Sequence, residues 1–508
     1  MIFETSSPPK GTIRDWLDHR AQTAPDDVCY LFPDGDAPLT WRTLKEQAHK
    51  IAVGLTATGI QQGESVAFCM SNGCAALVTF YGILYGGFRV TPLNLAAGPA
   101  ALGHAISHSK CRYICSAPAQ AEILSDALAQ TNATPEIINA AEQFSDQDVS
   151  VAVLAYITQT DHALLMYTSG TTGVPKGVVH THASLLAGGW TTAVAHELKP
   201  SDRALCVLPL YHINGLCVTV IAPLVSGGSS VICPKFSNSA FWDHCEKYKV
   251  TWFSVVPTII SHLLHGNTDP SDAARANLRF GRSASAPLAA DTQSSFETRF
   301  GLPIVETMGL TETAAQILSN PLPPGVRKIG SPGIAFGNEV TILTPEGVKQ
   351  DANETGEIAI RGPNVMLEYL DNDEATQNTK TSDGWLLTGD LGYMDDDGYV
   401  FVSGRLKELI IKGGENISPR EIDDSLYAHP DVVEAGAFAI ACDTYGQRVE
   451  AAVKLADNSQ ASEADLLELC RSKLGKFKSP DRIHFLAELP KGPSGKIQRL
   501  KLLDLFGG

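Results

Sequence analysis

The 508-residue sequence predicts an α/β protein, in which a large N-terminal domain with mostly parallel sheets plus a β-ribbon subdomain precedes a small α+β C-terminal domain. Three observations carry this prediction. In the first part of the chain, strand-like runs alternate with helical stretches, as in the crossover units of parallel sheets. Beyond about Gly337 the runs alternate between turns, as in an antiparallel ribbon. The length also exceeds the limit of one hydrophobic core, so at least two domains are expected.

The strand-like runs of the first part are short and apolar or β-branched. Between several of them the apolar positions step by three or four, so that Leu44, Ala48, Ile51 and Leu55 share one face of a predicted helix. The predicted strands occupy residues 65–70, 163–167, 204–210, 251–256 and 305–308.

The second part of the chain predicts the ribbon and the small domain. A new unit opens near Arg405, which divides the chain into domains 1–404 and 405–508, and about 100 residues suffice for a small domain. Ser418 to Glu421 predicts a capping box with Pro419 at the first helical position. Ribbon strands are predicted at 338–343, 356–361 and 399–403, small-domain strands at 408–412, 433–440 and 449–455, and a helix at 462–474.

Composition excludes several classes of protein. The net charge of −17 disfavours a dedicated nucleic-acid binder, which needs a basic surface. The 11 cysteines form no CxxC pair, so we expect buried thiols in a reducing compartment and no zinc site. No secretory signal, membrane span or peroxisomal address is visible, so the expected location is the cytoplasm.

The clearest chemical signal is a loop rich in hydroxyls and glycines, which follows an apolar strand and precedes a helix-like run from His182. Glycine permits a tight path on which backbone amides and hydroxyls converge on an anion, and Lys176 adds positive charge. This predicts a phosphate-binding loop, with a surface loop of similar composition as the alternative. It is not a Walker A motif, because Gly177 follows the lysine in place of Ser or Thr. The loop residues are Thr168, Ser169, Gly170, Thr171, Thr172 and Gly173.

Residues 163–182 closely resemble the signature of the adenylate-forming superfamily, which comprises acyl-CoA synthetases, adenylation domains and luciferases. The resemblance spans nearly the whole chain, in the family's order. It continues through residues 211–215, 283–288, 306–312, 387–390, 404–422 and 493–499.

For the nucleotide, the resemblance implies that Asp390 accepts hydrogen bonds from the ribose hydroxyls and that Arg405 contacts the ribose. Thr311 would meet a phosphate, and Glu312 would hold Mg²⁺, a cation that prefers oxygen ligands. Met308 stands where many relatives have a tyrosine that stacks on adenine, and its thioether can still pack on a ring. The other expected ATP contacts are the loop residues 168–173, Lys176, Ser285, Ala286, Pro287, Glu306, Thr307, Gly309 and Lys496.

For the reaction, the resemblance implies that Lys496 inserts into the active site with the carboxylate and the α-phosphate, beside Thr311 and Lys176. His212 would stand at the mouth of the acyl pocket and change position between half-reactions. Lys407 would be the hinge about which the mobile small domain rotates, and Lys412, Gly413 and Gly414 would line the coenzyme A tunnel. The expected pocket residues are His212, Val256, Ser283, Ala284, Gly309, Gln316 and Ile317.

The implied activity is that of an ATP- and Mg²⁺-dependent carboxylic acid–CoA ligase, which forms an acyl adenylate and then transfers the acyl group to CoA. The main alternative is a stand-alone enzyme that loads a carrier protein. A luciferase-like oxygenase would show oxygen uptake, and a non-enzymatic nucleotide-binding regulator is disfavoured by the intact Glu312, Asp390 and Lys496.

The acid is expected to be small or medium in size, because the pocket residues are partly polar and lack long aromatics. Residues 282–285, 320–323 and 361–365 resemble the oxalate- and malonate-type ligases, but Ala315 replaces the histidine expected for oxalate itself. The expected partners are the acid, ATP and CoA, without nucleic acid or a membrane. The state of association, including a homodimer, stays open.

Overall fold

Two large mixed sheets form most of the N-terminal part of the computed structural model, which describes residues 3–150, 153–168, 175–492 and 496–507. The α/β class is confirmed. In the first sheet, the strands from β13 to β1 are parallel, and antiparallel strands close both edges. Its spatial order is β15 (Ile334–Ala335), β14 (Ala315–Ser319), β13 (Ile304–Leu310), β12 (Phe280–Ser283), β11 (Trp252–Val255), β9 (Arg203–Cys206), β10 (Ser229–Ile232), β1 (Val28–Leu31) and β2 (Leu39–Thr40).

The second sheet ends in the hairpin that carries the phosphate-loop segment. Its strands from β7 to β6 are parallel, whereas β8 and β18 are antiparallel to their neighbours. The spatial order is β18 (Glu368–Tyr369), β8 (Lys176–Thr181), β7 (His162–Thr168), β4 (Arg89–Pro92), β3 (Ser65–Cys69), β5 (Tyr113–Ser116) and β6 (Glu136–Ile138).

Both sheets pack on one shared core of helices. This core joins Phe68 of β3 and Cys206 of β9 to Phe80 and Trp190 in the helices between them. The core helices are α1 (Ile13–Thr23), α2 (Trp41–Ala57), α3 (Cys74–Gly86), α7 (His182–Ala195), α8 (Ile213–Leu216) and α9 (Ala222–Ser226), with a π-helical turn at Cys217–Ile221. The other helices are α4 (Pro99–Ser109), α5 (Ala121–Leu128), α6 (Ala140–Gln143), α10 (Phe241–Lys247), α11 (Pro257–Leu264), α12 (Asp272–Asn277), α13 (Ala290–Phe300) and α14 (Asp373–Asn378), with 3-10 turns at Pro118–Gln120 and Thr311–Thr313.

A four-stranded antiparallel ribbon follows, as the alternating runs predict. It consists of β16 (Glu339–Leu343), β17 (Gly356–Arg361), β19 (Leu386–Met394) and β20 (Val400–Arg405). β20 ends at Arg405, the residue at which the sequence predicts a domain boundary.

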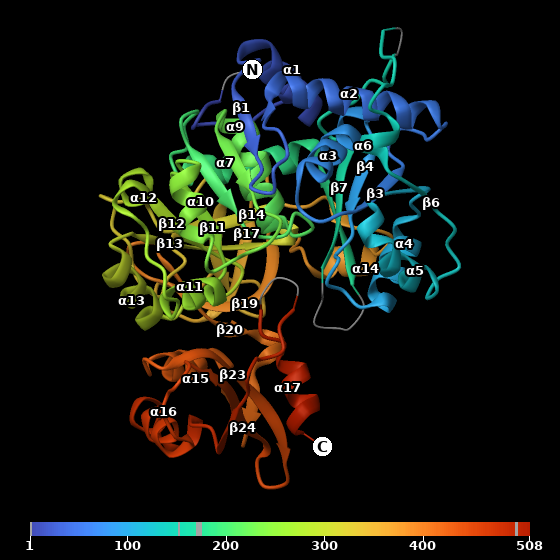
Figure 1. The fold of residues 1–508 in the computed structure, drawn as a ribbon. Helices are drawn as coiled ribbons and strands as arrows, with labels where there is room; N and C mark the ends of the chain where they lie inside the picture. Colours follow the sequence, from blue (N-terminus) through green and yellow to red (C-terminus); the bar gives the residue numbers. More distant parts are fainter. Residues whose placement is uncertain (1–2, 151–152, 169–174, 493–495, 508) are drawn as a thin grey trace.

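The C-terminal elements form a small lobe beneath the large one (Figure 1). Its sheet packs on α15 and α16 through a separate cluster that includes Ile422, Leu426, Val449 and Leu466. The elements are a 3-10 turn at Leu406–Glu408, β21 (Ile410–Lys412), β22 (Glu415–Ile417), α15 (Pro419–Tyr427), β23 (Val432–Cys442), β24 (Gly446–Leu455), α16 (Glu463–Lys478), β25 (Arg482–Phe485) and α17 (Arg499–Phe506).

The small lobe contacts α11 of the large one. Ser261 Oγ donates a hydrogen bond of 2.6 Å to the Val433 carbonyl, and His262 lies 3.4 Å from the buried Glu434 carboxylate. Glu434 also holds Lys491, so this interface connects the large lobe to the segment that leads towards Lys496.

Three details of the predicted elements need correction. The run at 204–210 forms a strand only as far as Cys206, and a strand, β8, lies between the phosphate loop and α7. Ser418 caps α15, but Glu421 pairs with Lys478, so no capping box forms.

Within the described residues, no helix is long and apolar enough to cross a bilayer.

Candidate active site

The segment after the phosphate loop is connected to Glu312 by contacts with Tyr369. Thr168 ends β7 and pairs with Lys176, the first residue of β8; Ser169, Gly170, Thr171, Thr172 and Gly173 lie outside the described residues. Lys176 Nζ lies 4.6 Å from the ring centroid of Tyr369, and the Tyr369 hydroxyl donates a 2.7 Å hydrogen bond to Glu312 Oε1. Burial and the Glu312 charge raise the pKa of Tyr369, which therefore stays a neutral donor.

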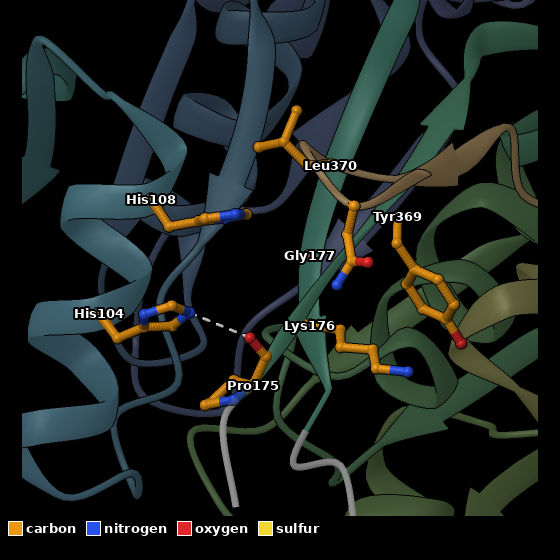
Figure 2. A pocket seen from close by; sticks show the side chains of 8 residues that line it. His104, His108, Pro175, Lys176, Gly177, Tyr369 and Leu370 are labelled. Atoms are coloured by element: carbon orange, nitrogen blue, oxygen red, sulfur yellow. Dashed lines mark hydrogen bonds between the residues drawn. The ribbon is translucent and has the colours of Figure 1, made fainter. Parts of the chain in front are cut away.

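Figure 2 shows Lys176 and Tyr369 together in one pocket, which His104 and His108 border on its other side. His104 Nε2 bonds the Pro175 carbonyl at 3.1 Å, so the start of β8 is fixed from both sides. Three of its lining residues, Pro175, Lys176 and Gly177, follow the predicted phosphate-binding loop in the sequence.

Thr311 and Glu312 lie in the 3-10 turn that follows β13. His180 of β8 donates from Nε2 to the Thr311 carbonyl at 2.7 Å, and burial lowers the pKa of His180 to about 4, so the ring is neutral. No described residue donates to Glu312 Oε2. One free carboxylate oxygen fits Mg²⁺ that arrives on ATP, because this ion is held mainly by phosphates and water with one or two carboxylates. The described residues contain no cluster of three or more ligands that could hold a metal ion alone.

Asp390 and Arg405 form the second charged part of the site. They are register partners on β19 and β20, and Arg405 Nε lies 2.7 Å from Asp390 Oδ1. Gly389 takes a φ of 74°, and its N–H donates to the Glu357 carboxylate at 2.8 Å, which fixes the turn that presents Asp390. The pair is thus held in place before a ribose binds.

Lys496 meets the same group of charges. Desolvation and the Arg405 charge lower its pKa to about 8, whereas Asp390, Glu408 and Glu312 oppose this shift. Lys496 keeps contact with solvent, which partly screens these charges. The structure therefore brings Lys496, Asp390, Arg405 and Glu312 together from both lobes.

Ser285, Ala286 and Pro287 follow β12 at the same edge of the sheet. Ser285 has a φ of 73°, outside a strand, and its Oγ accepts a 2.9 Å hydrogen bond from Asn214 Nδ2. Gly309 lies where β13 shifts register against β14, and a Cβ there would lie 1.4 Å from the Ala315 carbonyl oxygen. Met308, beside it, is half-buried.

Glu306 and Thr307, both predicted ATP contacts, turn their side chains into the protein. Glu306 is buried, accepts from the Leu288 N–H at 3.1 Å, and has its pKa raised to about 7 by burial. Thr307 Oγ1 donates to the Ser283 carbonyl at 3.2 Å. Their side chains therefore support the strand end.

The predicted acyl-pocket residues fall into two groups. His212 is the N-cap residue of α8 and is half-buried, whereas Ser283, Ala284, Val256 and Gln316 are buried near the strand ends. Ile317 packs instead in the cluster with Ile342 and Ile358 of the ribbon, away from that group.

The predicted tunnel residues lie in the small lobe. Gly413 and Gly414 form the exposed turn between β21 and β22, both with positive φ. Lys412 is buried and donates to the Phe477 carbonyl at 2.9 Å, so its side chain is committed within the lobe in this arrangement. Lys407 is exposed in the turn that joins the two lobes.

Sequence reasoning missed Tyr369 and the buried polar group of Arg282, Asn214 and Ser254. For Arg282 a signal existed, because it lies in the stretch 282–285 that resembles the oxalate- and malonate-type ligases. Tyr369 carried none, since it lies about 200 residues beyond the phosphate loop.

Comparison with known proteins agrees with this geometry. Residues 17–370 match the family model of AMP-binding enzymes, and residues 421–496 match the model of the AMP-binding enzyme C-terminal domain. The chain therefore belongs to the family of AMP-binding enzymes.

Two curated relatives match over nearly their whole length. The chain is 44% identical over 491 residues to a sulfoacetate–CoA ligase of Cupriavidus necator, with 96% of each chain covered. It is 35% identical over 495 residues to an oxalate–CoA ligase of Arabidopsis thaliana, which covers 93% of this chain and 96% of the relative.

Solved structures give the same picture. ATP-bound MatB from Rhodopseudomonas palustris superposes with a TM-score of 0.88 at 29% identity, over 97% of this chain and 99% of the other. The o-succinylbenzoate CoA synthetase of Bacillus subtilis, in complex with its acyl-adenylate intermediate, gives a TM-score of 0.86 at 28% identity, over 99% of each chain.

Proposed function

We propose that this chain is an AMP-forming carboxylic acid–CoA ligase that acts on a small acid. The single observation that carries the proposal is the convergence of Lys496, Asp390, Arg405 and Glu312 at the edge of the sheet where β12 and β13 end. Whole-length relatives that are acid–CoA ligases support the class of reaction, and the sulfoacetate and oxalate ligases among them support a short acid.

In the first step, a carboxylate oxygen of the acid attacks the α-phosphorus of ATP, the bond from this phosphorus to the bridging oxygen breaks, and pyrophosphate leaves. Two anions must approach each other, so positive charge is required at the reacting centre. Lys496 and Lys176 supply it from the protein, and Mg²⁺ bound to the phosphates and Glu312 supplies the rest. Asp390 and Arg405 hold the ribose, so that catalysis consists mainly of placement and charge stabilisation.

In the second step, the sulfur of CoA attacks the acyl carbonyl and AMP leaves. Lys496 lies within reach of the charges of Arg405, Asp390 and Glu312, while the Gly413-Gly414 turn lies in the small lobe. The small domain, which we place at 405–508, would rotate about Lys407 to exchange the two.

A panel of acids tests this proposal. Purified protein with Mg-ATP is offered mono- and dicarboxylic acids and sulfonated acids, with free CoA or a carrier protein as acceptor. We expect AMP, pyrophosphate and an acyl-CoA with at least one short acid, and a much lower rate with the carrier protein. Absence of AMP with every acid would contradict the proposal, whereas preference for the carrier protein would favour the stand-alone loading enzyme.

We also propose a cytoplasmic location for the protein. All 11 cysteines are free and 9 are buried, which supports a reducing compartment such as the cytoplasm. A homodimer stays a prediction, and light scattering of the purified protein distinguishes it from a monomer.

A further inference from the structure

A buried arginine lies next to the predicted acyl pocket. Arg282, in the centre of the first sheet, is 1% exposed. Its Nη1 donates to Asn214 Oδ1 at 2.7 Å and to Ser254 Oγ at 3.0 Å, and its Nε lies 3.4 Å from Gln316 Oε1. Asn214 follows His212 by two residues, and Gln316 is itself a predicted pocket residue.

The charge of Arg282 is not neutralised by the described protein. All three of its acceptors are neutral, no described residue accepts from Nη2, and no described carboxylate forms an ion pair with it. Burial lowers its pKa to about 9, which still leaves the guanidinium charged at neutral pH. By contrast, the charge of Arg279, three residues earlier, is neutralised by an ion pair with Asp202 at 2.8 Å.

An uncompensated buried charge costs several kcal/mol, and an apolar residue of similar volume would fill the same space without that cost. Arg282 is therefore a poor choice for packing alone. The two N–H groups of Nη2 have no acceptor among the described residues, and a guanidinium N–H is a strong donor to a carboxylate or a sulfonate oxygen.

We propose that Arg282 is the specificity-determining residue of the acyl pocket, where its guanidinium binds a second anionic group of the acid. The substrate is then a short acid that carries a carboxylate for adenylation and a further carboxylate or sulfonate at its other end. Asn214 positions the guanidinium and also donates to Ser285, so the anion site is tied to the loop predicted to contact the nucleotide. This inference rests on the proposed function and adds the charge of the substrate to it.

The test compares Arg282→Gln and Arg282→Lys with the wild type in acid-dependent pyrophosphate release. The acids are oxalate, malonate, succinate and sulfoacetate, against the monoanions acetate, propionate and 3,3-dimethylbutyrate. We expect Arg282→Gln to lower kcat/KM for the preferred dianion at least about 30-fold, because a buried charge partner is lost. The monoanions should keep or improve their kcat/KM, and Arg282→Lys should lie between the two. The preferred dianion identifies the second group as carboxylate or sulfonate.

Arg279→Gln is the matched control, because it removes an arginine from the same region whose charge is already paired. It should lower the thermal midpoint without changing the ratio of dianion to monoanion activity. Equal loss for both kinds of acid in Arg282→Gln would overturn the inference, as would a wild type that prefers monoanions. If Arg282→Gln does not fold, the ratio of dianion to monoanion activity in Arg282→Lys tests the inference instead. An unchanged ratio in that variant would overturn it. Failure of the proposed function is a separate result, since then no acid releases pyrophosphate from the wild type.

Discussion

At the residue scale, charged side chains from distant segments of the chain lie together at the proposed nucleotide site. Asp390 and Arg405 are paired by strand register, and Glu312 is held by Tyr369. The sequence predicted most of these residues because each stands in a recognisable motif. It could not predict Tyr369 or the partners of Arg282, since a hydrogen bond across the fold leaves no pattern in local spacing.

Replacing Lys496 by alanine should separate the two half-reactions. We expect the rate of acyl-adenylate formation to fall at least about 100-fold, because a charge contact to the transition state is lost. Thioester formation from a supplied acyl adenylate and CoA should be largely spared. Single-turnover rates of each step measure this, and equal losses in both steps would show that Lys496 is not specific to adenylation.

The pH dependence of adenylation should report the same lysine. The pKa of Lys496 is lowered from its usual value to about 8, and the protonated form supplies the positive charge. Activity is therefore present below this pKa and is lost as pH rises through it. The kcat/KM for pyrophosphate release, which reports the free enzyme, should decline above about pH 8. Lys496→Arg should remove this decline, because a guanidinium does not titrate in the range, whereas a wild-type decline that began only near pH 10 would contradict the shift.

At the element scale, the strand ends position the site. The sequence identified five strands of the two large sheets, β3, β7, β9, β11 and β13, because buried parallel strands are continuous apolar runs. It also identified three of the four ribbon strands, β16, β17 and β20. It missed β8, because polar residues at both ends obscure this short strand. It also placed the end of β9 too late, because the apolar residues in 207–210 pack in the hydrophobic core but form no strand. The predicted helix at 462–474 ends just before Gly475, whose backbone angles are not helical, whereas α16 continues to Lys478.

A methyl group at Gly309 should disturb the end of β13. Its Cβ would overlap the Ala315 carbonyl of β14, so Gly309→Ala must displace backbone and should cost about 1–3 kcal/mol or more. Gly98→Ala is the matched control, because a Cβ there meets nothing within 4 Å. Thermal melting and KM for ATP measure both variants. A Gly309→Ala protein as stable and active as Gly98→Ala would show that the strand end tolerates the shift.

At the scale of the whole molecule, two lobes contribute residues to the proposed active site. The small lobe lies beside the large one (Figure 1) and packs on α11 through Val433 and Glu434. The charges that act on Lys496 include those of Arg405, Asp390 and Glu312. The sequence placed a domain boundary near Arg405 from the pattern of predicted strands and helices. It could not give the arrangement of the lobes, because contacts such as those of Ser261 with Val433 and of His262 with Glu434 join residues that are far apart in the sequence.

Restricting the joint between the lobes should affect the second half-reaction more than the first. Lys407 is exposed, so Lys407→Pro removes backbone freedom with little loss of packing. We expect adenylation to stay within a few-fold of the wild type, while thioester formation falls about 10-fold or more. Lys407→Ala is the control, and an equal effect of both variants would assign the loss to the side chain.

The central claim is that the acid first forms an acyl adenylate with the AMP part of ATP, and that the acyl group is then transferred to CoA. The most direct measurement uses a substrate acid labelled with ¹⁸O in its carboxylate, followed by mass spectrometry of the products. The account predicts that one labelled oxygen appears in AMP, because the oxygen that attacks phosphorus stays with it when the thiol displaces the nucleotide. Unlabelled AMP beside an acyl-CoA product, or label in inorganic phosphate, would contradict it.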